Sequence, residues 1–165
     1  MSEVWKPSVT VAAIVERQGR FLMVEEHSGS DIRINQPAGH LEPGESLLDA
    51  VAREALEEAA RIFTPTALVG AYLSRNVSSS RGGMSVTYLR FAFAGQVGEP
   101  LERALDEGIL GTVWMTRDEL AACADRHRSP LVLRCVDDYL RGQRAPLELL
   151  HTDASAVGAL AGDGH

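Results

Sequence analysis

The sequence predicts a layered α+β or α/β fold in one domain, and two observations support this prediction. Short β-branched apolar runs alternate along the chain with two or three segments of helical periodicity. The length of 165 residues fits a single domain that can bury a core without disulfides or a structural metal. We expect that domain over residues 5–150. Residues 151–165 (HTDASAVGALAGDGH) lack a packing pattern, so we expect a disordered tail there.

The first strands are expected in the N-terminal part of the chain. Residues 9–15 (VTVAAIV) form a β-branched apolar run that is typical of a buried strand. Residues 16–19 carry turn signals and residues 21–24 predict a second strand, so we expect these two strands to pair as a hairpin. Residues 28–35 are polar, and we expect a loop there.

Residues 46–60 give the clearest helix prediction. Ser46 stands at the N-cap position, and Asp49 three residues later completes a capping-box pattern. Apolar residues at helical spacing share one face of this helix, and they are Leu48, Val51, Ala52, Ala55 and Ala59.

The rest of the chain predicts further strands and two more helices. In chain order, these are strands over 68–73, 86–94 and 112–115, and helices near 117–124 and 131–141. The segment 75–85 is rich in Ser and Gly, and we expect it to be mobile. Thr116 and Ser129 stand where helix caps belong, and Pro130 suits a first helical turn.

Charge and composition restrict the partners. A formal net charge of −7 argues against nucleic-acid coating or membrane-surface binding, which both favour a basic face. A polyphosphate substrate stays compatible with this charge if a bound cation offsets it. Cys123 and Cys135 fit two small buried residues in a reducing compartment. The sequence has no apolar run near the roughly 18 residues of a membrane span and no leader at its N-terminus, so we expect a cytoplasmic location.

The chemistry concentrates on the helix predicted over 46–60. Glu54, Glu57 and Glu58 stand at i, i+3 and i+4, within an arc of about 100° opposite the apolar face. Like charges repel there, and the C-terminal half of a helix disfavours anions. Mg²⁺ reverses that penalty, because it takes carboxylates, waters and phosphates as ligands, and the Gly39 carbonyl is a further candidate. A merely solvated glutamate face is the alternative, and the triplet alone leaves it open.

The spacing around this triplet is more specific than the triplet itself. Six residues match the pattern G-x5-E-x7-R-E-U-x-E-E-x-G-U, where U is a bulky aliphatic residue, and they are Gly39, Glu45, Arg53, Glu54, Glu57 and Glu58. Such a match arises by chance roughly once per ten million registers. The chain therefore resembles the Nudix hydrolase family, whose box this pattern is.

The box also departs from the family pattern at its end. Ala55 is a weak aliphatic residue, Ala60 replaces the final Gly, and Arg61 stands in place of the last aliphatic residue. That Gly normally ends the helix in a left-handed turn. We therefore expect the helix to run on slightly or to cap differently, with Ile62 taking the apolar role.

The resemblance extends over residues 5–150, through WKPSVTVAAIV, GRFLMVEE, NQPAGHLEPGE, YLRFAF, RSPLV and YLRGQRAPLELL. These segments are similar to bacterial phosphatase-type Nudix enzymes. The resemblance implies an α/β/α sandwich with a mixed sheet. It also implies hydrolysis of nucleoside tri- and diphosphates, or of the pyrophosphate of the hydroxymethylpyrimidine precursor of thiamine. Ile34 stands where these enzymes carry an aromatic residue, so a base-stacking contact is expected to be missing.

The resemblance also assigns roles. The implied metal ligands and catalytic residues are Glu54, Glu57 and Glu58, with the Gly39 carbonyl as a backbone ligand. The implied metal is Mg²⁺, with Mn²⁺ as a possible substitute. Glu45 is implied as a supporting carboxylate, and Arg53 as the residue that orients the glutamates.

Other roles stay open at the level of the sequence. Glu57 or Glu58 is a candidate general base, and Asp106 or Glu107 in the loop LDEGIL is the rival. Arg90 is the candidate phosphate contact. For Asp106, Glu107 and Arg90 the competing interpretation is a solvated surface residue.

Two alternatives differ in function. A Nudix enzyme for ADP-ribose, a nucleotide sugar or a dinucleoside polyphosphate would often carry Pro or Tyr 15 to 18 residues past the box, and residues 76–79 contain neither. A silent, ligand-binding Nudix domain would tend to lose carboxylates that this chain keeps. His40 is expected to be structural, since no second His or Cys accompanies it for zinc. The physiological small-molecule substrate, the released product and the choice between monomer and homodimer stay open.

Overall fold

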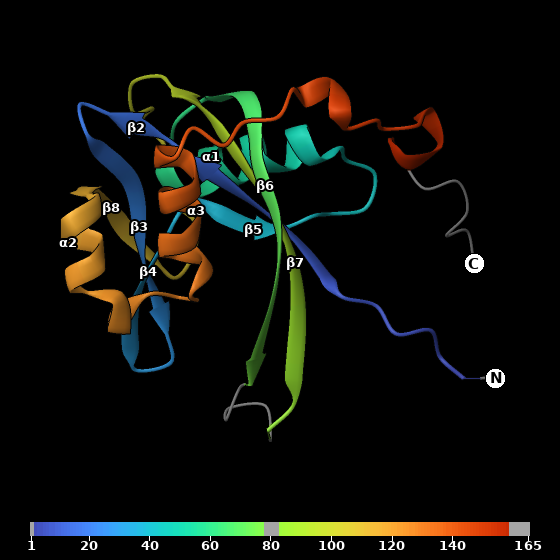
Figure 1. Ribbon diagram of the computed structural model, residues 1–165, viewed down its shortest axis with the longest axis horizontal. Coiled ribbons are helices and arrows are strands. Elements are labelled where there is room, and N and C mark those ends of the chain that lie inside the picture. The colour runs from blue at the N-terminus through green and yellow to red at the C-terminus, as the bar shows by residue number, and fades with distance from the viewer. Residues whose placement is uncertain (1, 78–82, 159–165) are drawn as a thin grey trace.

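The computed structural model describes residues 2–77 and 83–158, which form two four-stranded sheets with packed helices (Figure 1). The first sheet has the order β5 (Ala38–His40), β1 (Ser8–Ile14), β7 (Ser85–Val97) and β6 (Phe63–Val77). Strands β1 and β7 are parallel, whereas β1 with β5 and β6 with β7 are antiparallel. This sheet is therefore mixed, as expected.

The second sheet has β3 (Arg20–Ser28) at its centre. It pairs antiparallel with β2 (Glu16–Arg17), β4 (Asp31–Asn35) and β8 (Ile109–Thr116). The helices are α1 (Leu47–Ala59), α2 (Arg117–Ala122) and α3 (Leu131–Leu140). Short 3-10 turns occur at Ala124–Arg126, Leu147–Leu149 and Ala154–Ala156.

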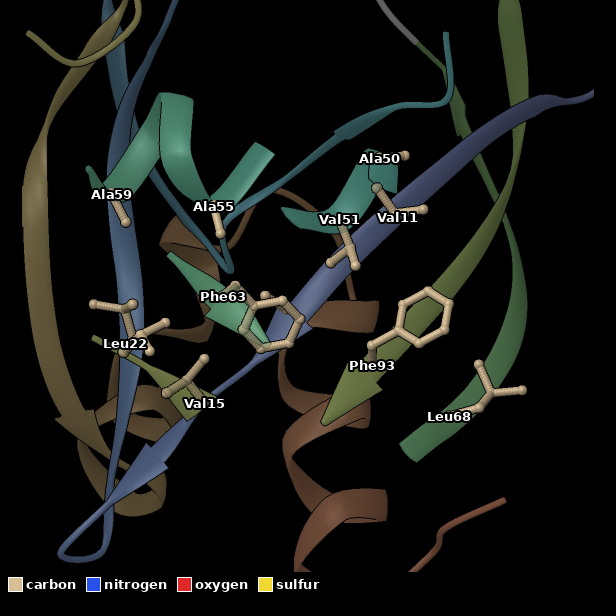
Figure 2. Packing of buried hydrophobic residues seen from close by; sticks show 12 residues of the cluster. Val11, Val15, Leu22, Ala50, Val51, Ala55, Ala59, Phe63, Leu68 and Phe93 are labelled. Atoms are coloured by element: carbon tan, nitrogen blue, oxygen red, sulfur yellow. The ribbon is translucent and has the colours of Figure 1, made fainter. Parts of the chain in front are cut away.

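The core lies in two layers on either face of the first sheet. Along β7, Phe93 joins the cluster under α1, whereas Ala92 and Ala94 join the cluster under α3. Figure 2 shows the first cluster, in which Val51 and Ala55 of α1 point toward Phe93 and the strands. Helices therefore cover both faces of a mixed sheet, and the expected α+β architecture is confirmed.

The hairpin expected between residues 9–15 and 21–24 is wrong. Strand β1 ends at Ile14 in the first sheet, and the partner of β3 in the hairpin is the short β2, with Glu16 opposite Phe21. The expected turn is present, since Gln18 and Gly19 have φ values of 53° and 75°. At Val15, which is 2 % exposed, the chain passes from one sheet to the other, and sequence periodicity carries no mark of that change.

The loop expected at residues 28–35 is also wrong. The turn is confined to Gly29 and Ser30, and β4 follows in register with β3, with Ile34 opposite Glu25. Ile34 is 1 % exposed, whereas Arg33 on the other face bonds to Asp31. The polar residues therefore belong to a two-sided strand, and their composition obscured the alternation.

Helix α1 ends where the glycine of the family pattern would have ended it. Ala60 adopts a left-handed conformation (φ 53°, ψ 37°), and its N–H donates to the Leu56 carbonyl. Ile62 is 62 % exposed, so the expectation that the helix runs on or caps differently, with Ile62 as the apolar residue, is wrong. Arg61 is buried in its place, with its guanidinium 5.6 Å from the centre of the Trp114 ring and donating to the Gly98 carbonyl.

The helix N-termini carry the expected capping side chains, except that Pro130, which was expected in the first turn of α3, occupies the N-cap position of that helix. Ser46 Oγ accepts a bond of 3.1 Å from the Asp49 N–H. In α2, Thr116 and Glu119 form both bonds of a capping box. Helix α3 begins after Pro130, and Ser129 Oγ accepts from the Leu131 N–H.

Strands β6 and β7 are longer than expected and form a ribbon that extends beyond the other elements (Figure 1). The expectation of a mobile segment fails for residues 75–77 and 85, which are paired in β6 and β7. Residues 78–82 of that segment lie outside the described residues, as do residues 159–165 of the expected tail. Within residues 151–158, the Gly158 N–H donates to the Gly44 carbonyl, and the domain boundary at residue 150 stays a prediction. Among the described helices, each is too short or too polar to cross a membrane.

Candidate active site

A cleft of about 420 Å³ lies beside the C-terminal half of α1. Its walls come from α1, the edge strand β5, the outer part of the β6–β7 ribbon, β3, and the segment that precedes α3. Five of the six box residues line the cleft, and Glu45 is the exception. Asp106 and Arg90 also line it. Residues that stand far apart in the sequence therefore meet in one polar cavity.

Two of the box glutamates are buried against β5. Glu54 and Glu58 are each 8 % exposed, although they stand opposite the apolar face of the helix. Glu58 Oε2 accepts a bond of 3.1 Å from the Ala38 N–H. The Glu54 carboxylate lies against Gly39, where a Cβ atom would collide with it. The alternative interpretation, a solvated glutamate face, is therefore excluded for Glu54 and Glu58.

Arg53 connects the acidic residues to one another. Its Nε and Nη2 donate to the two oxygens of Glu45 at 2.9 and 2.7 Å. Its Nη1 donates to Glu54 at 2.9 Å and to Glu57 at 3.0 Å. Nη2 also donates to the His40 carbonyl at 2.9 Å, which ties β5 to the helix. One guanidinium thereby fixes the directions of three carboxylates.

The buried carboxylates are electrostatically crowded. Burial, together with the nearby charges of Glu54, Glu26 and Asp106, raises the pKa of Glu58 to about 8, although the hydrogen bond from Ala38 lowers it. Burial also raises the pKa of Glu54, which Arg53 opposes. Repulsion among these buried carboxylates is therefore relieved either by protonation of one of them or by binding of an additional cation.

The donor set fits a divalent cation of the Mg²⁺ type by its chemistry. Carboxylate oxygens and the backbone of Gly39 border the same part of the cleft, and oxygen ligands are those that Mg²⁺ takes. Because Gly39 has no side chain, the Glu54 carboxylate occupies the space beside the backbone of residue 39. Within residues 2–77 and 83–158, no three acidic, His or Cys side chains already converge on one metal position, and Arg53 holds Glu54 and Glu57 by hydrogen bonds.

The two loop acids differ in position. Asp106 lines the cleft, and its N–H donates to the Glu57 carbonyl at 2.9 Å. Glu107 is exposed and is absent from the described lining. Of the two loop acids, Asp106 therefore lies near the glutamates, whereas Glu107 lies outside the described lining of the cleft.

Arg90 is buried at the base of the cleft, with 6 % of its surface exposed. Its Nη1 donates to Gln36 Oε1 and its Nη2 donates to Asn35 Oδ1, both at 3.0 Å. Gln36 is anchored in turn, because its Nε2 donates to the Val132 carbonyl at 2.7 Å. The guanidinium is thus held by two neutral amides, and its charge also lowers the pKa of Glu26, which burial raises, in the same wall of the cleft. A solvated strand Arg is excluded.

Several lining residues were missed by sequence reasoning. Glu26 on β3 lies in the wall, and burial raises its pKa. Its Oε1 is shut off from solvent without a hydrogen-bond partner, and Arg128 Nε lies 3.7 Å away, which is a charge contact rather than a bond. The strand expected over 21–24 ended too early to include it. His40, which was expected to be structural, also lines the cleft.

Ile34 lies elsewhere. It packs in the core cluster under α3 and is absent from the described lining of the cleft. The expected loss of a stacking contact therefore does not follow from an aliphatic residue at this position.

The chain is similar in sequence and in fold to several known proteins. The family model described as NUDIX domain matches residues 4–135. "Phosphatase NudJ" from Escherichia coli (strain K12) is 35 % identical over 147 residues, which cover 88 % of this chain and 92 % of the relative. A solved "NUDIX hydrolase from Nitrosomonas europaea" is 47 % identical, with a TM-score of 0.82 over 90 % of this chain and 98 % of the other. A MutT NUDIX hydrolase from Burkholderia pseudomallei is similar in fold alone, with 18 % identity and a TM-score of 0.63 over 81 % and 98 % of the two chains.

Proposed function

The chain belongs to the Nudix hydrolase family, and from this premise we propose that it cleaves a phosphoanhydride bond in a small nucleoside di- or triphosphate or in a pyrimidine pyrophosphate, with Mg²⁺. Members of the family typically use a divalent metal. The observation that carries the proposal is the buried pair Glu54 and Glu58 at the edge of the cleft, with Arg53 bonded to Glu54 and to the neighbouring Glu57. The similarity to a NudJ phosphatase supports the substrate class.

The proposed ligand set is Glu54, Glu57 and Glu58 with the carbonyl of Gly39. When bound, a divalent cation would offset the negative charge of the substrate and activate water. Mn²⁺ is the proposed substitute, because it also accepts oxygen ligands. Arg53 and Glu45 would act through the ligands, since their bidentate pair sets the direction of the guanidinium that holds Glu54 and Glu57.

The remaining groups of the cleft have complementary tasks in this proposal. Arg90 would bind a phosphate oxygen, because its guanidinium lines the cleft and donates hydrogen bonds to the neutral amide oxygens of Gln36 and Asn35. A carboxylate that faces the reacting phosphorus would accept the proton of the attacking water. Glu57 and Glu58 are the candidates on the helix, and Asp106 is the candidate from the loop. In-line attack then expels phosphate or a nucleotide.

Two further assignments belong to the same proposal. The cytoplasm is the proposed location, on the ground that both Cys123 and Cys135 are free thiols. The proposed partner is a small phosphorylated molecule. The protein itself would act as a monomer or a homodimer.

A substrate panel tests the function directly. The intact chain is assayed with Mg²⁺ against nucleoside diphosphates, nucleoside triphosphates, ADP-ribose and the thiamine-precursor pyrophosphate, and released phosphate and pyrophosphate are measured separately. We expect turnover of the nucleotides or of the pyrimidine pyrophosphate, and its loss with EDTA. Preference for ADP-ribose would overturn the substrate class, and absence of any turnover would overturn the function.

A further inference from the structure

The outer half of the β6–β7 ribbon has an inverted polarity. Cross-strand partners share a face, and the register places Ser74 opposite Tyr88 and Tyr72 opposite Arg90. Ser74, Tyr88 and Arg90 line the cleft, whereas Leu73 on the other face is 69 % exposed. A ribbon that turns its polar and aromatic side chains inward and an aliphatic one outward has an inner face suited to a ligand.

Two aromatic rings meet on that inner face. The rings of His40 and Tyr88 lie with their centroids 6.2 Å apart at an angle of 49°. Among the described residues that line the cleft, these two are the aromatic ones. These two rings form the aromatic surface of the cleft, and Ile34, where a stacking contact was expected to be missing, lies in the core.

The aromatic surface stands at a fixed place relative to the phosphate-binding groups. Thr10 of β1 is in register with both His40 and Arg90, so these three residues form one row across the sheet. Tyr88 stands two residues before Arg90 in β7 and on the same face, which is a separation of roughly 7 Å at the usual rise of a strand. Arg53 holds the His40 carbonyl together with the glutamates.

From these relationships we propose that Tyr88 and His40 form the ring-binding subsite of the cleft and select substrates with an aromatic ring. The inference rests on the proposed function and deepens it. A substrate whose phosphates lie between Arg90 and the glutamates would extend its organic part along β7 toward Tyr88. Stacking on Tyr88 then favours nucleosides and pyrimidines, because every such ring has a π-face. Sugar phosphates and inorganic polyphosphates lack that contact.

The test separates ring binding from phosphate binding. Equilibrium dissociation constants are measured with Mg²⁺ for a methylene-bridged CTP analogue, which cannot be hydrolysed at its bridged positions, and for inorganic tripolyphosphate. The proteins are the wild type, Tyr88→Ala, Tyr88→Phe and Leu73→Ala. We expect Tyr88→Ala to weaken the CTP analogue by about 10-fold or more while tripolyphosphate changes by less than about 2-fold. Tyr88→Phe keeps the stacking face and should bind both probes like the wild type.

Leu73→Ala is the matched control, because Leu73 lies in the same ribbon on the outward face. It should leave both constants unchanged. Equal weakening of the two probes in Tyr88→Ala, or weakening of neither, would overturn the inference, provided that the thermal unfolding midpoint shows a folded protein. Because binding is measured without turnover, a wild type that binds the analogue but hydrolyses no nucleotide would overturn the proposed function alone.

Discussion

Glu54 occupies the space that a side chain at position 39 would need. The glycine lies on the edge strand β5, the glutamate lies on α1, and a Cβ atom at residue 39 would overlap the carboxylate. A backbone position and a helical acid, which stand 15 residues apart in the sequence, are therefore coupled by direct contact.

Replacing Gly39 by Ala should move the Glu54 carboxylate and leave the fold intact. The displaced atoms are the far end of a flexible side chain, so we expect a small change in the thermal unfolding midpoint. Because ligand directions depend on such contacts, kcat/KM should fall by about 10- to 100-fold, and more Mg²⁺ should be needed for half-maximal rate. Gly111→Ala is the control, since a Cβ there meets nothing within 4 Å. Equal rates in the two variants would argue against a ligand role for Glu54.

Replacing Glu57 by Gln should abolish most turnover. Glu57 shares Arg53 Nη1 with Glu54 and borders the cleft, and the amide keeps its size but removes its charge. Loss of a metal ligand or general base predicts that kcat falls by at least ~100-fold. Asp49→Asn is a control on the exposed side of the same helix. Rates like those of the wild type in Glu57→Gln would refute the assignment of this residue.

The metal-free protein should lose stability as the pH rises. The pKa of Glu58 in the folded chain is about 8, above its ordinary value of 4.5, so between these two values the folded state binds more protons than the unfolded state. The free energy of unfolding contributed by this group is therefore highest below about pH 4.5 and falls as the pH approaches 8. Protons and the metal compete for the same carboxylates.

Thermal unfolding with EDTA and with Mg²⁺, at pH 5.5 and pH 8, measures this competition. Mg²⁺ should raise the midpoint more at pH 8 than at pH 5.5, because the ionised cluster gains more from a cation there. Glu58→Gln should flatten the pH dependence in EDTA, since the amide does not titrate. A midpoint that rises from pH 5.5 to pH 8 in EDTA and is indifferent to Glu58→Gln would contradict the prediction.

Restoring the family glycine at the end of α1 should stabilise the protein. Ala60 has a positive φ of 53°, where a Cβ is unfavourable and glycine has no such penalty. We expect Ala60→Gly to raise the free energy of unfolding by about 0.5–1 kcal/mol, with the flexibility of glycine in the unfolded chain reducing the gain. Chemical denaturation measures it, and Ala52→Gly, within the helix, should instead destabilise. A loss of stability in Ala60→Gly would mean that packing around Arg61 determines this turn.

The sequence was sufficient for features that depend on spacing along one element. The i, i+3, i+4 pattern correctly placed Glu54, Glu57 and Glu58 on one side of α1, and Ser46 bonds as a cap. The spacing pattern could not predict the burial of Glu54 and Glu58, because the atoms that cover them belong to β5, about 15 to 20 residues earlier in the chain. Helical periodicity assigns a residue to a face and carries no information on what packs there.

The same limit explains the errors in the strands. Val15 passes between two sheets without any change in composition, and Ile34 was hidden in a polar segment. The role of Arg90 could not be decided between a phosphate contact and a solvated surface residue. Its partners, Asn35 and Gln36, lie more than fifty residues away in the sequence. Glu26 and Tyr88 belong to the cleft only through the register of their strands.

The register of the β6–β7 ribbon carries a consequence for insertions and deletions. Side chains alternate between faces with a period of two, so removing Ala71 or Tyr72 would turn the Leu73 side chain inward and the Ser74 side chain outward. Strand β6 already contains two irregularities in its pairing, between Pro65 and Ala67 and between Leu68 and Gly70. Sequence length just beyond these bulges is therefore constrained by chemistry at the cleft, even where single substitutions are tolerated.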